Sequence, residues 1–122
     1  MTWFYSQKSG LLKHGPNHYE SCGYSGAGVC KNGPEFQDLH NLGPIPRGKY
    51  TIGEPYDTEK HGPFVLPLTP HPENEMFGRF GFLIHGDSVH SPGTASEGCI
   101  ILPRVARNRI AESDDHDLEV TL

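Results

Sequence analysis

The sequence lacks the features that mark membrane proteins and nucleic-acid-binding proteins. No apolar stretch approaches the roughly 20 residues that a membrane-spanning helix requires. Basic residues number only 10 against 15 acidic ones, which gives a net charge of −5, and they form no run of lysine or arginine. Because binding to a phosphate backbone depends on clustered positive charge, the composition argues against both membrane insertion and a nucleic-acid partner.

The sequence also leaves little room for long helices. Its 122 residues include 15 glycines and 11 prolines, which divide the chain into short segments. The apolar fraction of 34% and the mean hydropathy of −0.53 are low, but six phenylalanines, five tyrosines and one tryptophan supply large surfaces for a core. A chain of this length suits one compact unit, so we expect a single, mainly β domain over residues 1–122.

Cysteine is scarce and odd in number. Cys22 and Cys30 lie close together in a loop-like segment, and the sequence leaves open whether they form a disulfide. Cys99 is left over in either case. The N-terminal residues 1–10 lack the basic, apolar and small-residue regions of a secretory signal. We therefore expect the protein to be made in the cytoplasm without a signal peptide.

Alternating apolar positions and boundaries of glycine and proline predict a series of short strands. The expected strands cover residues 2–7, 11–14, 48–54, 62–70, 78–86, 98–103 and 117–122, and short helical segments are expected over 34–40 and 104–113. In the strand over 78–86, Phe80, Phe82 and Ile84 share one face. Because side chains alternate along a strand, His85 is expected on the opposite face, at the strand's end.

The stretch FLIHGDSVHSPGTASEGCIILP, residues 82–103, contains the side chains that we expect to do chemistry. A thiol is a strong nucleophile only as a thiolate, and a nearby imidazole can accept its proton and hold the resulting charge as an ion pair. His85 and Cys99 each lie where a strand meets the intervening loop, so adjacent strands can bring them into contact. We therefore predict that Cys99 is a nucleophile and His85 its base.

The residues around this pair suggest how a reaction would be supported. Gly98 has no Cβ, so the chain can approach a substrate closely and turn the N–H groups of Gly98 and Cys99 toward a developing oxyanion. A third group must orient the imidazole of His85. The candidates are the carbonyl of Gly86 and the side chains of Asp87 and Ser96. The sequence does not choose among them.

A zinc site is the competing interpretation of these residues. The potential ligands are His61, His71, His85, His90 and Cys99. No pair of them has the close, regular spacing of zinc motifs, so we expect neither a metal nor another cofactor. A buried, inert cysteine beside a histidine that merely ends a strand is the structural alternative.

The motif order resembles that of a known enzyme family. IHG followed by SEGCI is similar to the catalytic signature of the L,D-transpeptidases, in which His-Gly precedes Ser/Thr-x-Gly-Cys. The segments WFYSQKSGLL, GYSGAGVCKNGPEFQ, GPIPRGKYTIG and GPFVLPLTP precede it. Together they span nearly the whole chain and resemble the small L,D-transpeptidase-related toxins that bacterial type VI secretion systems deliver. In papain-like and cell-wall Cys/His peptidases the cysteine comes first instead.

This resemblance implies an L,D-transpeptidase-like β-sandwich or curled sheet with one or two short helices. It implies Cys99 as nucleophile, His85 as base, and Ser96 and Gly98 as parts of the motif that shapes the pocket. The substrate would be the tetrapeptide stem of peptidoglycan, and Cys99 would attack the bond between the diamino acid and the terminal D-alanine. Water, a free D-amino acid or the amine of another stem would then accept the acyl group, which gives trimming, exchange or cross-linking.

The sequence departs from the family pattern around the cysteine. Glu97 stands where a histidine is usual, Ile101 stands where an arginine is frequent, and the loop between the two motif halves is short. Without the usual arginine, the substrate's carboxylate needs another partner, and an arginine elsewhere can pair with it through two N–H groups. The candidate substrate-binding residues are Arg79, Asp87, Ser88, Glu97 and Arg104.

The resemblance also implies partners and a place of action. A toxin of this type would use the type VI secretion machinery, act on peptidoglycan stem peptides in the periplasm of target bacteria, and have a cognate immunity protein that blocks the active site. Two rival functions remain open. One is a Cys/His amidase that cuts another bond of peptidoglycan, and the other is a non-catalytic peptidoglycan-binding module.

Overall fold

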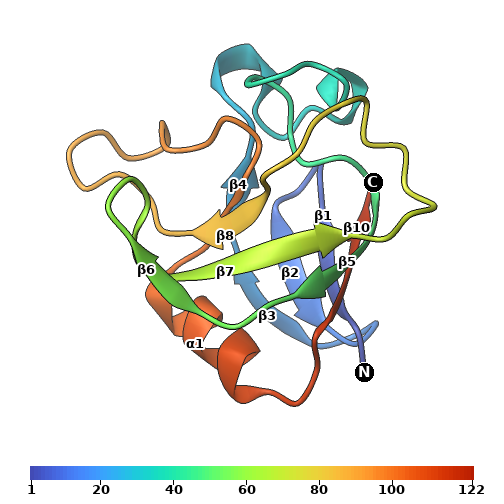
Figure 1. Ribbon diagram of the computed structural model, residues 1–122, viewed down its shortest axis with the longest axis vertical. Coiled ribbons are helices and arrows are strands. Elements are labelled where there is room, and N and C mark those ends of the chain that lie inside the picture. Colours follow the sequence, from blue (N-terminus) through green and yellow to red (C-terminus); the bar gives the residue numbers. More distant parts are fainter.

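The computed structural model describes all residues from 1 to 122, and most of its regular structure is β-strand. The strands are β1 (Trp3–Ser6), β2 (Leu11–His14), β3 (Tyr19–Cys22), β4 (Tyr24–Ser25), β5 (Gly48–Ile52), β6 (Tyr56–Thr58), β7 (Gly62–Pro70), β8 (Leu83–His85), β9 (Ile100–Ile101) and β10 (Asp117–Thr121). The helical elements are two 3-10 turns, η1 (Gly28–Cys30) and η2 (Pro34–Phe36), and one α-helix, α1 (Arg104–Glu112). The expected mainly β class is confirmed (Figure 1).

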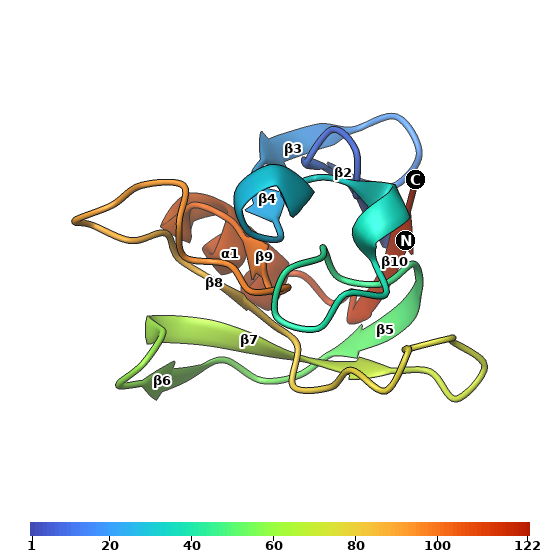
Figure 2. The ribbon, with the colours of Figure 1, turned by 90° about the horizontal axis from the view of Figure 1, so that it is seen from above.

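The strands form one mixed sheet that curls without closing. Their order is β3-β2-β1-β10-β5-β7-β8-β9-β4, and β6 pairs with β7 beside this path. The pairs β1–β10 and β8–β9 are parallel. Figure 2 shows β5, β6 and β7 along one side of the molecule and β2, β3 and β4 along the other, with α1 and β9 between them. The curled sheet expected from the resemblance is therefore present.

One cluster of 16 buried residues fills the inside of the curl. Trp3 and Tyr5 from β1, Tyr50 from β5 and Ile84 from β8 are each 0% exposed. Ile110 extends the cluster from α1. Burial of a large apolar side chain contributes on the order of 1.5–3 kcal/mol. The cluster therefore holds together strands that are far apart in the sequence.

The only α-helix, α1, begins directly after Pro103 and packs against β7. Proline suits this position because it lacks an N–H and has a restricted φ. The helix turns Ala106, Arg107 and Ile110 toward the interior. No helix in the structure combines the length and the apolar character needed to cross a membrane.

The parallel pair β8–β9 positions the residues predicted to react. Ile84 pairs with Ile100 and both belong to the core, whereas His85 pairs with Ile101. Because successive side chains point to opposite faces of a sheet, His85 and Ile101 point away from the core cluster. Cys99 lies two residues before Ile101, so it is directed to the same face as His85.

The strand that carries His85 is shorter than expected. β8 begins at Leu83 rather than near residue 78, and Phe80 is 89% exposed instead of facing the core. Gly78 and Gly81 have φ values of +73° and +79°. These left-handed conformations are incompatible with a continuous strand, so only the last residues of the segment join the sheet.

The sequence left open whether Cys22 and Cys30 form a disulfide. All three thiols are free in the structure, with Cys22 exposed, Cys30 buried and Cys99 half-buried. The structure therefore has no bridge between Cys22 and Cys30.

Candidate active site

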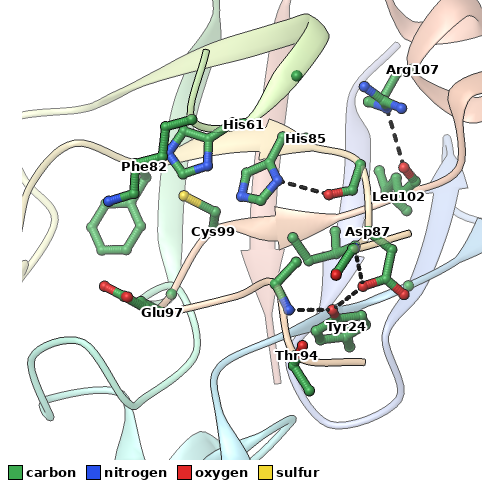
Figure 3. Close-up of a pocket in the computed structure, with 18 of the residues that line it drawn as sticks. Tyr24, His61, Phe82, His85, Asp87, Thr94, Glu97, Cys99, Leu102 and Arg107 are labelled. Atoms are coloured by element: carbon green, nitrogen blue, oxygen red, sulfur yellow. Dashed lines mark hydrogen bonds between the residues drawn. The ribbon is translucent and has the colours of Figure 1, made fainter. Parts of the chain in front are cut away.

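The end of β8 and the start of β9 open into a pocket of about 1390 Å³. Its wall includes residues 22–24, the β6–β7 turn, the loop between β8 and β9, and the start of α1. His61, His85 and Cys99 lie together there, and the Cys99 sulfur points toward both imidazole rings (Figure 3). Pockets of roughly 300–1,000 Å³ hold drug-sized ligands, so a peptide segment fits this one.

The imidazole of His85 is held by one hydrogen bond. Its Nδ1 lies 2.9 Å from the carbonyl oxygen of Gly86, and the residue is 2% exposed. A carbonyl oxygen can only accept, so Nδ1 carries the proton and Nε2 keeps its lone pair. Nε2 is buried without a hydrogen-bond partner, on the side of the ring that faces Cys99 (Figure 3). Of the three possible orienting groups, the structure selects the Gly86 carbonyl.

Burial favours the neutral forms of both His85 and Cys99. It raises the pKa of the Cys99 thiol above its usual value, although a hydrogen bond from the backbone of Leu83 acts in the opposite direction. Burial also lowers the pKa of His85, against the effect of its bond to Gly86. Rather than the expected ion pair, both effects favour a neutral thiol and a neutral imidazole. Such a pair can still react, because the imidazole can take the proton while the sulfur attacks.

The N–H of Gly98 is not available for an oxyanion, contrary to expectation. It donates to the Oγ of Ser96 at 3.0 Å. The same Oγ accepts the N–H of Gly26 at 2.9 Å and donates to the carbonyl of Cys99 at 2.6 Å. Ser96 thus shapes the turn before the cysteine and makes no hydrogen bond to His85, so it is not the group that orients the imidazole. The N–H of Cys99 makes no hydrogen bond within the protein and remains the candidate oxyanion donor.

A second buried serine, which the sequence analysis did not single out, ties this turn to β4. The Oγ of Ser25 donates to the carbonyl of Gly98 at 2.9 Å and accepts the N–H of Ile45 at 2.8 Å. Ser25 also lies opposite Ile100 in the β4–β9 pair. Because Ser25 is 0% exposed, its loss would leave buried backbone groups unpaired, at a cost of about 1–3 kcal/mol.

The guanidinium of Arg79 is used inside the protein. Its terminal nitrogens donate to four backbone carbonyls, those of Gln37, Pro44, Gly43 and Glu97, at 2.6, 2.8, 2.9 and 3.4 Å. The residue is 7% exposed. Since both terminal nitrogens are engaged, Arg79 does not offer a free pair of N–H groups to a carboxylate. Its expected substrate-binding role gives way to that of a brace between residues 37–44 and the loop that ends at Cys99.

Arg107 of α1 is a buried pocket residue that the sequence analysis missed. Its Nε donates to the carbonyl of Leu102 at 3.2 Å, and its Nη1 donates to the carbonyls of Pro63 and Phe64 at 3.0 and 2.9 Å. Its Nη2 makes no hydrogen bond within the protein and lies beside Gly86, where an added Cβ would be 2.8 Å from it. Arg107 therefore joins α1, β7 and β9 and still presents one free nitrogen.

Asp87 is directed toward β4 rather than toward His85. Its Oδ1 accepts the Tyr24 hydroxyl at 2.5 Å and the Ser88 N–H at 2.8 Å, and both of its oxygens accept the N–H of Gly93 (Figure 3). Burial alone would raise the pKa of Asp87, but these hydrogen bonds lower it below its usual value. Burial and the bond to Asp87 raise the pKa of Tyr24 to about 12. This pair fixes the loop after β8 against β4.

The other expected substrate-binding residues also line the pocket. Arg104 is exposed, and its guanidinium lies 4.5 Å from the centre of the Phe64 ring. Glu97 is exposed beside Cys99, where its charge contributes to the raised pKa of the thiol. The Oγ of Ser88 accepts the N–H of Ser91 at 3.0 Å, so this side chain organises the loop.

The histidines considered as zinc ligands do not converge as a set. His71 lies on a different part of the surface, near β5, and His90 is exposed in the loop after β8. His61, His85 and Cys99 share the pocket, but no group of three or more His, Cys, Asp and Glu side chains is arranged to hold a metal ion.

His61 lies against His85 with its ring tilted, a contact that no sequence motif indicated. It lies in the β6–β7 turn, and its ring centroid is 4.3 Å from that of His85 with 32° between the ring planes. Burial and the charge of Lys60 lower the pKa of His61, while Glu97 acts in the opposite direction. A histidine between Lys60 and Gly62 carries no spacing signal, and only the pairing of β7 with β8 brings it here.

Comparison with known proteins gives one match. The family model described as the Tlde1 domain matches residues 20–121. The matched range contains His61, His85 and Cys99. No curated protein matches the chain, and no solved structure matches it.

Proposed function

The chain belongs to the Tlde1 domain family of type VI secretion L,D-transpeptidase effectors, and we propose that it is a cysteine-dependent acyl-transfer enzyme acting on the tetrapeptide stems of peptidoglycan. The family implies secretion and action in the periplasm. The proposed reaction cleaves the bond between the diamino acid and the terminal D-alanine. Transfer to water then trims the stem, and transfer to a free D-amino acid exchanges its last residue.

Cys99 and His85 carry out the first step. As the sulfur attacks the carbonyl carbon, its proton passes to the Nε2 of His85, while the Gly86 carbonyl holds the opposite side of the ring. The developing oxyanion is stabilised by the N–H of Cys99. The C–N bond then breaks, the proton passes from Nε2 to the leaving amine, and D-alanine departs from a thioester at Cys99.

The orientation of His85 is the observation that carries this proposal. Its proton is fixed on Nδ1, and its buried Nε2 has no partner in the protein and faces the thiol (Figure 3). A buried polar atom without a hydrogen bond is uncommon and calls for an explanation. A base that receives a proton only during the reaction supplies that explanation.

The other end of the pocket suits the carboxylates of a stem peptide. Arg104 and the free Nη2 of Arg107, both from α1, line the pocket, and Nη2 lies beside Gly86; guanidinium groups pair well with carboxylates. We also expect a cognate immunity protein to close the pocket in the producing cell. Type VI secretion machinery would carry the enzyme to its target.

Replacement of the nucleophile tests this function, and the chain offers a matched control. Cys99→Ala should abolish the change in wall composition that the wild type causes in a target periplasm, with a loss of about 10³-fold or more in rate. Cys22→Ala removes another thiol of the same pocket wall and should act like the wild type. Mass spectrometry of digested wall measures stems that have lost or exchanged one D-alanine. Release of whole peptides would indicate an amidase, and an unchanged wall would indicate a binding module.

A further inference from the structure

Glu97 works against the nucleophile beside which it lies. Its negative charge contributes to the raised pKa of the Cys99 thiol. A carboxylate at this position therefore hinders the loss of the thiol proton, on which the first step of the proposed reaction depends. A role in the second half of the reaction, when the thioester is broken down, would account for its placement.

The carboxylate of Glu97 is available to a ligand. The residue is exposed and lines the pocket, and its side chain makes no hydrogen bond or ion pair within the protein. Lys60, whose charge also reaches the Cys99 thiol, forms no ion pair with it. Figure 3 shows Glu97 on the side of Cys99 that faces away from Arg107. A cation can therefore bind next to the sulfur, apart from the guanidinium groups proposed to hold the carboxylates of the stem.

The turn that carries Glu97 is fixed on both sides. The Oγ of Ser96 accepts the N–H of Gly98 and donates to the carbonyl of Cys99. The carbonyl of Gly98 in turn accepts from the Oγ of Ser25 at 2.9 Å. The backbone from which the carboxylate extends thus keeps its position relative to the sulfur, as a residue that selects a substrate requires.

We propose that Glu97 selects an amine over water as the acceptor of the acyl group, by binding the ammonium of an incoming D-amino acid beside the thioester at Cys99. The inference rests on the proposed function. It makes exchange of the terminal residue, rather than trimming, the favoured outcome whenever free D-amino acids are present.

The chemistry of the two acceptors explains this selection. A D-amino acid arrives as an ammonium, and it releases one proton to solvent before its nitrogen can attack. When the neutral amine bonds to the thioester carbon, the nitrogen becomes positively charged again, and a nearby carboxylate stabilises that charge. One of its protons then passes to the Nε2 of His85, the C–S bond breaks, and His85 returns the proton to the sulfur. Water passes its proton to His85 as it attacks, so it develops less positive charge and gains less from Glu97.

The thioester divides between the two acceptors in a ratio that does not depend on how fast it forms. Wild type and Glu97→Gln are each mixed with purified tetrapeptide stems and millimolar D-methionine. Mass spectrometry then gives the ratio of exchanged to trimmed stems, while the burst of D-alanine in the first turnover reports formation of the thioester. Glu59→Gln is the matched control, because Glu59 is another exposed acid of the pocket wall but is not among the charges that act on Cys99.

We expect Glu97→Gln to lower the ratio of exchange to trimming on the order of tenfold, because the ammonium loses a charged partner. Glu59→Gln should keep the ratio of the wild type. Glu97→Asp retains the charge on a shorter side chain and should exchange more than Glu97→Gln. Glu97→Ala repeats the measurement should the glutamine variant not fold.

Methanol in place of D-methionine shows whether the amine is what Glu97 recognises. Its hydroxyl gives a methyl ester and carries no ammonium, so the ratio of ester to trimmed stem should be equal in the wild type and in Glu97→Gln. An unchanged ratio with D-methionine, an equal fall with methanol, or an equal fall in Glu59→Gln would overturn the inference, as would a wild type that trims without exchange. A wild type that releases no D-alanine would instead overturn the proposed function.

Discussion

At the residue scale, Gly98 is required for packing and conformation rather than for its N–H. Its φ is +139°, a value that side chains disfavour. An added Cβ would lie 2.4 Å from the Nη2 of Arg79 and 3.1 Å from the Phe82 ring. Arg79 in turn braces the loop that ends at Cys99. A methyl group at position 98 therefore acts on the nucleophile through Arg79.

Gly98→Ala should impair both stability and activity. The strained φ costs about 1–3 kcal/mol, and displacement of the Arg79 guanidinium should move Cys99 and lower the acylation rate. Gly28→Ala is the control, because Gly28 also has a positive φ of +56° but nothing lies within 4 Å of its added Cβ. Urea denaturation and the D-alanine burst measure the two effects. Equal stability loss in the two variants with a normal burst from Gly98→Ala would contradict this account.

Sequence reasoning predicted that Cys99 and His85 lie together, but not how the residues around them are bonded. Cys99 and His85 carry a recognisable local motif, and strand alternation places them on one face. The roles of Gly98, Ser96 and Arg79 depend on hydrogen bonds to segments around residues 26 and 37–44, which are far away in the sequence. No local pattern encodes such contacts, so the sequence assigned Arg79 to the substrate and the Gly98 N–H to the oxyanion.

At the element scale, Arg107 joins α1, β7 and the residue that follows β9. It extends from α1 to the carbonyls of Pro63 and Phe64 in β7 and to that of Leu102 after β9. The Leu102 carbonyl is buried and needs a donor, whereas those of Pro63 and Phe64 are partly buried. The start of β7, next to His61, and the segment after Cys99 are thus held by one side chain.

Arg107→Met should loosen this junction. Loss of a charged donor shared by three carbonyls should lower the free energy of unfolding by about 2–4 kcal/mol. Arg104→Met serves as the control for stability, because Arg104 is exposed and its only hydrogen bond is to Asn108. Thermal unfolding that does not distinguish the two variants would refute the junction.

The elements themselves were predictable where apolar residues alternate and not elsewhere. β1, β2, β5, β7 and β10 coincide with expected strands. β3, β4 and β6 were missed because they are short, largely polar and defined only by their partners. The strand that contains β8 was predicted to be too long because the apolar Phe80 was assigned to it, although Gly78 and Gly81 lie on either side of Phe80.

At the scale of the whole molecule, burial of neutral histidines makes stability depend on pH. The pKa values of His85 and His61 are lowered in the folded protein, chiefly by burial. Below the unfolded value of about 6.5, the unfolded chain therefore binds protons that the folded one does not. The free energy of unfolding must therefore become smaller as the pH falls from about 6.5 toward the pKa values of the folded protein. The lowered pKa values of Asp87 and Glu20 act in the same direction at more acidic pH.

We expect the free energy of unfolding to be smaller at about pH 5.5 than at about pH 7.5, two values on either side of the usual histidine pKa of about 6.5. A histidine that is protonated in the unfolded chain but not in the folded protein changes the free energy of unfolding by about 1.4 kcal/mol per pH unit. His85→Asn keeps a donor for the Gly86 carbonyl but does not titrate, so the difference between the two pH values should shrink in this variant. Urea denaturation of both proteins at each pH measures this double difference, in which the contributions of the six histidines other than His85 and its neighbour His61 cancel. An equal or larger pH effect in His85→Asn would mean that His85 is charged in the folded protein, and the neutral thiol–imidazole pair would have to be abandoned.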